Sequence, residues 1–226
     1  MTGEGTGTGR GHGEIPDATV SRLPLYHRAL IGLHQSGVTT VSSEQLADMA
    51  GVNAAKVRKD LSYFGSYGTR GVGYDVEQLL AEIRNDLGLQ HEWNCIIVGA
   101  GNLGSALLSF AGFRDRGFHV AAAVDVAPDR VGRNLGGITI SHQDDLAALI
   151  TRHDIAIGVI ATPPASAQEV ADALVAAGVR SILNFAPTVV EVPEGVLIRH
   201  VDLASELEIL AFHEGRRTHP LQAPTG

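Results

Sequence analysis

The chain has little cysteine and no long apolar run. One cysteine, Cys95, is present among 226 residues, which excludes an intramolecular disulfide. It lies in the apolar run CIIVG, where a small buried side chain is expected rather than a reactive thiol. No apolar run approaches the ~20 residues that span a bilayer, and the first residues lack the apolar segment of a secretion signal. These absences predict a cytoplasmic protein without membrane contact.

Lysine is also scarce, and the chain is acidic overall. Only Lys56 and Lys59 occur, and the formal net charge is −8. A negative chain looks unsuited to nucleic acid, but DNA meets only the face that is presented to it. The two lysines flank Arg58, and Arg70 follows, with Asp60 as the one acid in this stretch. We therefore expect any DNA contact to involve these residues.

Composition divides the chain into five segments. Residues 1–14 carry many glycines and residues 215–226 are polar, so we expect both to be disordered tails. Residues 15–90 have helical apolar spacing, whereas residues 91–201 alternate short apolar runs with helical segments, as in a parallel sheet covered by helices. Residues 202–214 predict a last helix with a leucine stripe, which packs either on its own domain or on a partner chain.

Residues 43–61 have the spacing of a helix-turn-helix, whose second helix enters the major groove of DNA. Ser42 and Gln45 are spaced as a capping box, Gly51 suits the turn, and Asn53 can cap the second helix. The alternative is an ordinary helical hairpin with a solvated charged face. The residues expected to contact DNA are Ser43, Asn53, Lys56, Arg58, Lys59, Tyr63 and Arg70.

Chemistry suggests different roles for these side chains. Arg58 has the geometry to read a guanine with two hydrogen bonds, while Lys59 is suited to neutralise a phosphate. The segment GSYGTRGVGYDV follows, and its glycines and alternating apolar residues predict a tight hairpin with Arg70 near the tip. Such a hairpin is the wing of a winged helix, and an arginine at its tip suits a minor groove.

A glycine-rich loop of the form G-x-G-x-x-G follows the first apolar run of the second half and opens a helix. Gly99 permits the tight turn, Gly101 lets the backbone approach a pyrophosphate, and Gly104 allows close packing of helix on strand. The start of the helix supplies N–H groups to the phosphates. The predicted phosphate-binding loop is Gly99, Ala100, Gly101, Asn102, Leu103 and Gly104.

Asp125 ends the second predicted strand, where an acid accepts hydrogen bonds from the adenosine ribose. It would repel a 2′-phosphate, which favours NAD(H) over NADP(H), although Arg130 and Arg133 nearby weaken that preference. The alternative is a solvated acid at a strand end. Thr162 follows another strand at its carboxyl end and is a further candidate for cofactor contact, or else part of a plain turn; residues 184–187 are similarly placed.

Two classes of chemistry lack support in the sequence. The ten histidines are scattered without a metal-binding pair, and no nucleophile-elbow motif is present, so we predict no metal and no catalytic residue. The second half has little room for a substrate domain, which argues against an NAD-dependent dehydrogenase whose first helices only mediate oligomerisation. A regulator that senses another nucleotide, such as coenzyme A or NADPH, stays open as a second alternative.

Several motifs occur together and in a fixed order: RLPLYHRAL, VSSEQLA, VRKDLSYFGSYGTRGVGYDV, VGAGNLGSAL, ILNFAP and VDLASEL. Over residues 15–212 the chain thereby resembles the Rex family of bacterial redox-sensing transcriptional repressors. The resemblance implies an α/β fold with a winged helix-turn-helix domain, a Rossmann domain and a C-terminal helix that is swapped between subunits. It implies a homodimer that binds an inverted-repeat operator in double-stranded DNA, senses the NADH/NAD⁺ ratio and is released by NADH.

The resemblance also implies a switch. An arginine of the first helix pairs across the dimer with an aspartate that opens the swapped helix, and these match Arg28 and Asp202. On their own, Arg28 would be expected in solvent and Asp202 as a helix cap. Phe110 stands where the family usually has a tyrosine near the nicotinamide, so the ring can still pack but the hydroxyl is lost. We predict a DNA-binding repressor that is not an enzyme.

Overall fold

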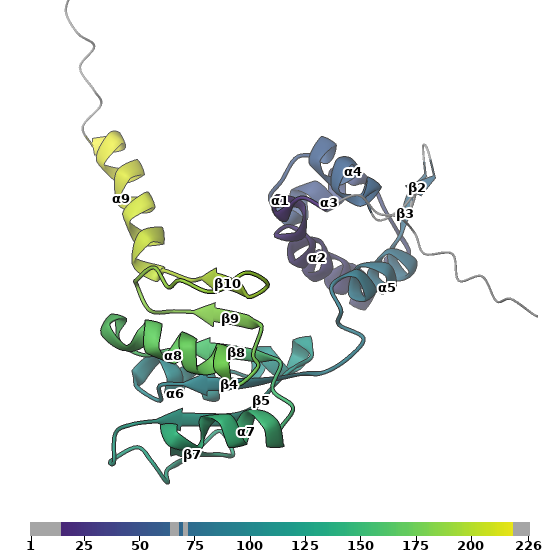
Figure 1. Ribbon diagram of the computed structural model, residues 1–226. Coiled ribbons are helices and arrows are strands. Elements are labelled where there is room, and N and C mark those ends of the chain that lie inside the picture. The colour runs from purple at the N-terminus through teal and green to yellow at the C-terminus, as the bar shows by residue number, and fades with distance from the viewer. Residues whose placement is uncertain (1–14, 64–67, 70–71, 219–226) are drawn as a thin grey trace, which may run out of the picture. The chain divides into compact units, whose positions relative to one another are not determined.

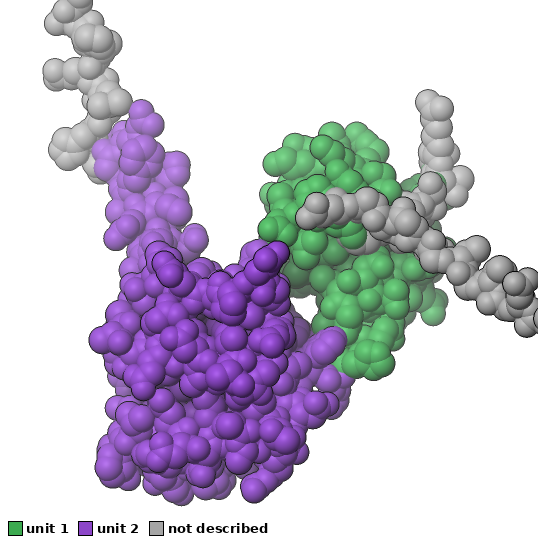
Figure 2. Space-filling model, viewed as in Figure 1, with its two compact units in different colours: residues 1–91 green, residues 92–226 purple. Residues whose placement is uncertain are grey.

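The computed structural model describes residues 15–63, 68–69 and 72–218 (Figure 1). The chain forms two compact units, residues 1–91 and 92–226, which are coloured separately in Figure 2. Within the described ranges, no helix is both long enough and apolar enough to cross a membrane.

Unit 1 contains helices and a small antiparallel sheet of strand order β1-β3-β2. Helices α3 and α4 form the predicted helix-turn-helix, and β2 and β3 form the predicted wing. The core consists of apolar side chains from all the long helices, including Leu30, Leu46, Val57 and Leu79. Its elements are α1 (Asp17–Val20), α2 (Leu23–Gln35), β1 (Thr40–Val41), α3 (Ser43–Ala50), α4 (Ala54–Ser62), β2 (Gly68–Thr69), β3 (Gly73–Asp75) and α5 (Val76–Asp86).

The ends of α3 and α4 follow from local hydrogen bonds that the sequence predicts. The Ser42 hydroxyl accepts a bond from the Gln45 N–H at 3.1 Å, and the Gln45 side-chain oxygen accepts one from the Ser42 N–H at 2.9 Å. Gly51 ends α3 with a left-handed φ of 68°, a conformation that costs glycine little. Asn53 caps α4 by accepting a bond from the Lys56 N–H. These contacts confirm the predicted starts of both helices and the predicted end of α3 at Gly51, whereas α4 ends at Ser62, before the stop at Gly65 that the sequence predicts.

Unit 2 is a seven-stranded sheet of order β10-β9-β8-β4-β5-β7-β6, parallel except for the β6–β7 pair. Read without β6, this is the strand order of a dinucleotide-binding Rossmann fold, which confirms the predicted class. Its strands are β4 (Trp93–Val98), β5 (Phe118–Asp125), β6 (Asn134–Leu135), β7 (Ile138–His142), β8 (Ile157–Ile160), β9 (Ser181–Asn184) and β10 (Leu197–His200).

Helices cover this sheet and extend beyond it. They are α6 (Asn102–Leu108), the 3₁₀ helices η1 (Ala111–Arg116) and η2 (Gln143–Asp145), α7 (Leu146–Arg152), α8 (Pro164–Ala176) and α9 (Leu203–Thr218). Helix α9 stands away from the sheet in Figure 1, and its side chains from 203 to 217 are exposed. It continues past residue 214, where the sequence predicts its end. Within this last turn, Arg217 bonds Glu214 and Arg216 lies over the Phe212 ring, contacts that favour continued helix.

Candidate DNA-interface and nucleotide site

The predicted recognition helix, α4, has one buried and one exposed face. Val57, Asp60 and Leu61 are buried, whereas Lys56, Arg58 and Lys59 are exposed. Since a helix turns by about 100° per residue, Lys59 lies near the middle of the exposed face and Arg58 lies toward its margin. Asn53 is exposed, Ser43 buried and Tyr63 half-buried, while Arg70 lies outside the described residues. The exposed face thus carries three cations.

Arg58 is held by the start of α3. Its Nη1 donates to Ser43 Oγ at 2.9 Å and to Glu44 Oε1 at 3.0 Å, and Ser43 Oγ donates to Glu44 Oε2 at 3.2 Å. The Glu44 backbone N–H and the Arg58 guanidinium together lower the pKa of the Glu44 carboxyl. Glu44 is a functional candidate that sequence reasoning missed, because its contact with Arg58 joins residues from different helices.

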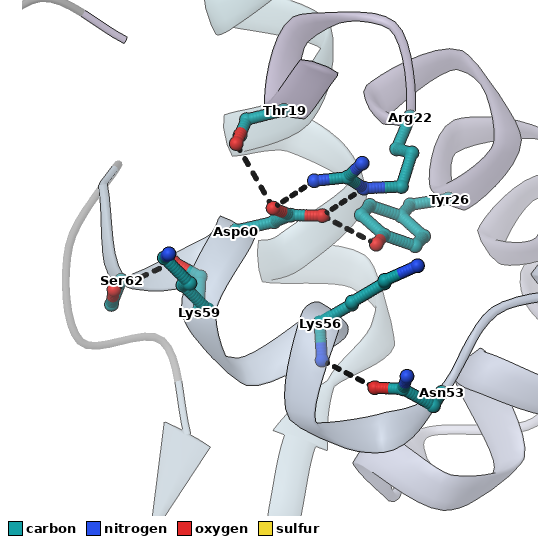
Figure 3. Close-up of polar contacts among 8 residues, drawn as sticks. All are labelled: Thr19, Arg22, Tyr26, Asn53, Lys56, Lys59, Asp60 and Ser62. Atoms are coloured by element: carbon teal, nitrogen blue, oxygen red, sulfur yellow. Dashed lines mark hydrogen bonds and ion pairs between the residues drawn. The ribbon is translucent and has the colours of Figure 1, made fainter. Parts of the chain in front are cut away.

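Asp60 is the centre of a buried polar cluster in unit 1 (Figure 3). The carboxylate is 1% exposed and accepts bonds from Arg22 Nε at 2.6 Å, Arg22 Nη2 at 2.7 Å, the Tyr26 hydroxyl at 2.7 Å and the Thr19 hydroxyl at 3.0 Å. Burial opposes its ionisation, but the bonds from Arg22, Tyr26 and Thr19 outweigh it and lower the pKa of Asp60. Helix α4 is therefore fixed to α1 and α2 through a charged contact on its buried side.

The Asp60 cluster has a recognisable but weak signal in the sequence. Asp60 stands between Val57 and Leu61, so its place on the apolar face of α4 follows from helical periodicity alone. Arg22 and Tyr26 are four residues apart and share one face of their segment. The contact between these two faces forms only in the folded domain, so local periodicity does not reveal it. Treating Asp60 only as a negative charge therefore overlooks its role in joining the helices.

The predicted phosphate loop lies at the carboxyl ends of β4 and β8, where ligands bind in open α/β sheets. A cavity of about 600 Å³ opens there. It brings together several of the predicted nucleotide-site residues with Phe185, from the further candidate segment 184–187, and with Arg130, which was not proposed as a site residue from the sequence. The lining includes Gly99, Gly101, Leu103, Asp125, Arg130, Thr162 and Phe185.

The three glycines of the loop serve different steric needs. Gly99 has φ +96°, and a Cβ there would lie 2.7 Å from the Ala161 carbonyl oxygen. A Cβ on Gly104 would overlap the carbonyl oxygen of Gly99 itself. At Gly101, by contrast, the nearest atom to a Cβ would be Arg130 Nη1 at 3.9 Å. The backbone at Gly101 therefore stays open to the cavity, as a phosphate-binding loop requires.

Asp125 is almost fully buried, and its carboxylate already accepts hydrogen bonds from the protein itself. It is 4% exposed and accepts bonds from the Ala100 N–H at 2.6 Å, the Ala127 N–H at 2.8 Å and Arg130 Nη1 at 3.2 Å. Burial disfavours its charge, yet these three donors lower the pKa of its carboxyl. Asp125 therefore ties the glycine loop to the turn after β5.

Thr162 has a hydroxyl group with which a ligand could form a hydrogen bond. Its Oγ1 is buried and has no hydrogen-bond partner among the described residues, and the side chain lines the cavity. A buried hydroxyl without a partner is costly, so a polar ligand at this position would relieve an unfavourable state. Open backbone at Gly101, the fixed Asp125 and the buried Thr162 hydroxyl together fit a nucleotide.

Phe110 lies apart from this lining. It is 57% exposed and borders a second cavity of about 460 Å³, lined largely by apolar side chains of β4, β5, β8 and β9. Cys95 borders the same cavity, and burial raises the pKa of its thiol to about 11, as expected for an unreactive side chain. Helix α9 exposes further apolar residues, namely Leu203, Leu207, Ile209, Leu210 and Phe212.

The proposed switch residues, Arg28 and Asp202, have the surroundings expected of each on its own, in solvent and as a helix cap. Arg28 is exposed on α2, and the Asp202 carboxylate caps α9 by accepting bonds from the Ala204 N–H at 2.9 Å, the Ser205 N–H at 3.3 Å and the Ser205 hydroxyl at 2.9 Å. The Ser205 hydroxyl and the two N–H groups lower the pKa of Asp202. Among the residues the structure describes, no group of three His, Cys, Asp or Glu side chains is arranged to hold a metal ion.

Comparison with known proteins matches both units. A family described as the N-terminus of putative DNA-binding proteins matches residues 14–62, and a CoA binding domain family matches residues 90–188. The redox-sensing transcriptional repressor Rex of Streptomyces griseus is 61% identical over 203 residues, which cover 90% of this chain and 80% of the relative. The Rex of Carboxydothermus hydrogenoformans is 49% identical over 200 residues, covering 88% and 96%.

This chain belongs to the Rex family. Solved structures agree: a complex of RSP with β-NAD⁺ and operator DNA has a TM-score of 0.86 at 34% identity and covers 91% of this chain and 95% of that one. The complex of RSP, a Rex-family repressor, with β-NADH has a TM-score of 0.81 at the same identity, covering 90% and 96%. The Rex fold thus extends over both units, and the relatives carry the name of transcriptional repressors.

Proposed function

We propose that this Rex-family chain is a transcriptional repressor that senses the NADH/NAD⁺ ratio and is not an enzyme. It binds an inverted-repeat operator in double-stranded DNA as a homodimer and leaves the operator when NADH binds. One observation carries the proposal: the same chain joins a helix-turn-helix with exposed cations to a phosphate loop that opens into a cavity of about 600 Å³. As a repressor that acts on chromosomal DNA, the protein would work in the cytoplasm.

The nucleotide site would hold the dinucleotide through the chain's own backbone and polar groups. The open backbone at Gly101 and the neighbouring loop residues, Ala100 and Asn102 to Gly104, take the phosphate side, while Asp125 and Thr162 take hydroxyl or amide groups. Oxidised nicotinamide is positively charged and reduced nicotinamide is neutral. An apolar nicotinamide environment therefore favours the reduced form, because an unpaired charge is costly to bury. Phe110 is proposed as part of that environment from the family resemblance, although it does not line the cavity of about 600 Å³.

The DNA interface would be formed by α4, the start of α3 and the wing. Lys56, Arg58 and Lys59 are exposed there, and Arg58 is oriented by Ser43 and Glu44. Asn53 and Tyr63 flank the same helix, and Arg70 would act from the wing. The charged Asp60 cluster supports this interface by holding α4 on α1 and α2.

Dimerisation would use the apolar surfaces of unit 2. The exposed leucines of α9 and the apolar cavity of about 460 Å³ are large uncovered apolar features, which commonly mark protein interfaces. A second copy that donates its α9 would cover both. In that assembly Asp202, at the start of α9, would approach Arg28 of the other subunit and link cofactor binding to the DNA-binding unit.

The deciding experiment measures operator binding by fluorescence anisotropy on the DNA upstream of the chain's own gene. We expect binding that persists with NAD⁺ and is lost with NADH. Release by NADPH or coenzyme A instead would favour a sensor of another nucleotide, an alternative to which the matched CoA binding domain family lends weight. NADH oxidation with small carbonyl substrates, without any operator binding, would favour a dehydrogenase and would contradict the proposal.

A paired glycine substitution tests whether the loop carries the response. Gly99→Ala places a Cβ at left-handed φ against the Ala161 carbonyl, so we expect NADH to lose its effect while operator binding persists. Gly178→Ala is the matched control, because Gly178 also has positive φ (+100°) but no atom within 4 Å of its Cβ position. Equal NADH responses in the two variants would contradict the assignment of the loop.

A further inference from the structure

Arg130 occupies an unusual position at the nucleotide site. It lies in the turn between β5 and β6 and lines the cavity of about 600 Å³, with 40% of its side chain exposed. Its Nη1 donates to Asp125 Oδ2 at 3.2 Å. Among the described residues that line this cavity, Arg130 is the one cation, beside the acids Asp125 and Glu169.

Asp125 holds the guanidinium in place. The carboxylate is almost fully buried and is itself fixed by two backbone N–H groups, those of Ala100 in the glycine loop and Ala127 in the following turn. A guanidinium carries five N–H donors, and the contact with Asp125 uses one of them. The others stay available to a ligand in the cavity, with the orientation of the group set by a rigid acid.

The guanidinium faces the backbone on which a phosphate would rest. A Cβ at Gly101 would have Arg130 Nη1 as its nearest neighbour, at 3.9 Å, with no other atom within 4 Å. Gly101 is the position of the G-x-G-x-x-G loop where the backbone approaches a pyrophosphate. An anion seated on this loop is therefore within hydrogen-bonding reach of Arg130.

The charges around the cavity also favour a cation that pairs with the diphosphate. A dinucleotide brings two negative charges on its diphosphate, and Asp125 and Glu169 already make the lining acidic. Burying a charge without a partner is unfavourable, whereas hydrogen bonds between a guanidinium and a phosphate are among the strongest that proteins form. Arg130 supplies the cation that this cavity needs.

We propose that Arg130 binds the diphosphate of the dinucleotide and that Asp125 is the residue that positions it. The inference rests on the proposed nucleotide-sensing function. Because NADH and NAD⁺ share the diphosphate, Arg130 sets the affinity for both and leaves the discrimination between them to the nicotinamide end of the site.

The test compares Arg130→Gln with Arg133→Gln by calorimetric titration with NADH, NAD⁺ and ADP-ribose, which has the diphosphate but no nicotinamide. We expect Arg130→Gln to weaken all three by a similar factor, about tenfold to a hundredfold for the loss of a hydrogen bond to a charged group. The ratio of NADH to NAD⁺ affinity should stay unchanged. Arg133 is exposed and is not part of the cavity lining, so its variant should bind as the parent does.

A probe without phosphate separates contact with the diphosphate from an effect transmitted through Asp125. Adenosine, measured by displacement of NADH fluorescence, should bind the parent and Arg130→Gln equally. If adenosine weakens as much as ADP-ribose does, Arg130 acts on the ribose and the inference is wrong. Arg130→Lys, which keeps the charge, should recover part of the lost affinity and serves if the glutamine variant folds poorly.

The outcomes also separate this inference from the proposed function. If the parent protein binds none of the three nucleotides, the proposed nucleotide sensor fails. If the parent binds them and Arg130→Gln binds them equally well, only the role of Arg130 is contradicted.

Discussion

At the scale of single residues, Asp60 shows how a charged side chain can belong to a core. Its four short hydrogen bonds satisfy a carboxylate that is 1% exposed, and its main partner, Arg22, keeps 23% of its side chain exposed. A buried ion pair often contributes little net stability compared with apolar residues, but removal of one partner strands the other. The orientation of α4 should therefore depend on the charge of Asp60, which is removed when one carboxylate oxygen is replaced by an amide nitrogen.

Asp60→Asn tests this sensitivity. Asparagine keeps the shape but removes the charge opposite Arg22, so we expect the free energy of unfolding to fall by roughly 3 kcal/mol, the lower end for a broken buried pair. Because the pKa of Asp60 is lowered in the folded state, its stabilisation is present above the unfolded value of about 3.9 and is lost as pH falls through the folded pKa.

The measurement is chemical denaturation of parent and variant from pH 7 down through this window. The stability difference between them should shrink as the parent's carboxylate becomes protonated. Asp48→Asn is the control, since Asp48 is an exposed acid on the neighbouring α3 and its loss should change stability by less than about 0.5 kcal/mol. A difference that does not vary with pH would show that the charge of Asp60 is not what matters.

The adjacent cations of α4 are expected to act differently on DNA. Arg58→Ala should cost roughly 1–3 kcal/mol at the operator and less on unrelated DNA. Lys59→Ala should weaken binding to all sequences and reduce the slope of log affinity against log salt by about one. Competition binding at several salt concentrations measures both. Exchanged results would assign base reading to Lys59, which lies nearer the middle of the exposed face, and unchanged affinities would exclude α4 from the interface.

At the scale of elements, the sequence predicts what local chemistry specifies. Ser42, Gln45, Gly51 and Asn53 locate the helix-turn-helix because capping and left-handed turns depend on neighbours within four residues. The strand, glycine loop and helix that begin unit 2 were predictable for the same reason. The Rossmann strand order then follows from alternating strands and helices, since parallel crossovers are right-handed and neighbouring strands usually pair.

The sequence did not predict elements that lack such local signals, or contacts between residues far apart in the chain. The β6–β7 hairpin has strands of two and five residues, too short for a clear alternation, although Gly136-Gly137 with positive φ at both positions is a tight-turn signal that could have revealed it. The polar site contacts are harder, because Asp60 with Arg22, Arg58 with Glu44, and Asp125 with Ala100 join residues 14 to 38 positions apart. No periodicity encodes such pairs.

Helix α9 is the element whose exposed surface predicts a partner. Leu207 is 67% exposed, so Leu207→Glu should leave the folding of unit 2 unchanged. If α9 forms the dimer contact, the charge should weaken dimerisation by about 2 kcal/mol or more, as for a central interface residue. Sedimentation velocity and operator binding should then report monomers and weaker DNA affinity together. Glu208→Gln, on the same turn, is the control, and an unchanged dimer in Leu207→Glu would exclude α9 from the interface.

At the scale of the whole molecule, the acidic total charge and the function as a DNA-binding repressor are compatible. The net charge of −8 is summed over both units, while three cations of the proposed interface, Lys56, Arg58 and Lys59, lie on one helix of unit 1. Nucleic acid responds to the local potential of the face it meets. An acidic remainder also disfavours unspecific binding elsewhere on the surface, so the charge distribution itself favours one orientation on DNA.

A sensor also needs a link between its units, and Arg28 with Asp202 is the proposed one. Asp202 already caps α9, so Asp202→Ala changes both the cap and the charge. We expect this variant to shift the NADH concentration that releases half of the operator by roughly fivefold or more, as for a typical allosteric coupling. Ser205→Ala separates the two effects, because it removes one bond of the cap and keeps the charge; its NADH response should match the parent's.

The pair itself is tested by charge reversal. Arg28→Asp and Asp202→Arg should each disturb the NADH response, and the double variant should recover part of it, since opposite charges then face each other again across the dimer. Operator binding is measured against NADH concentration for the parent, both single variants and the double variant. The energies of two residues that interact are not additive, whereas those of independent sites add. Additive effects without recovery would mean that Arg28 and Asp202 do not communicate, and the coupling between the two units would then have to run through other residues.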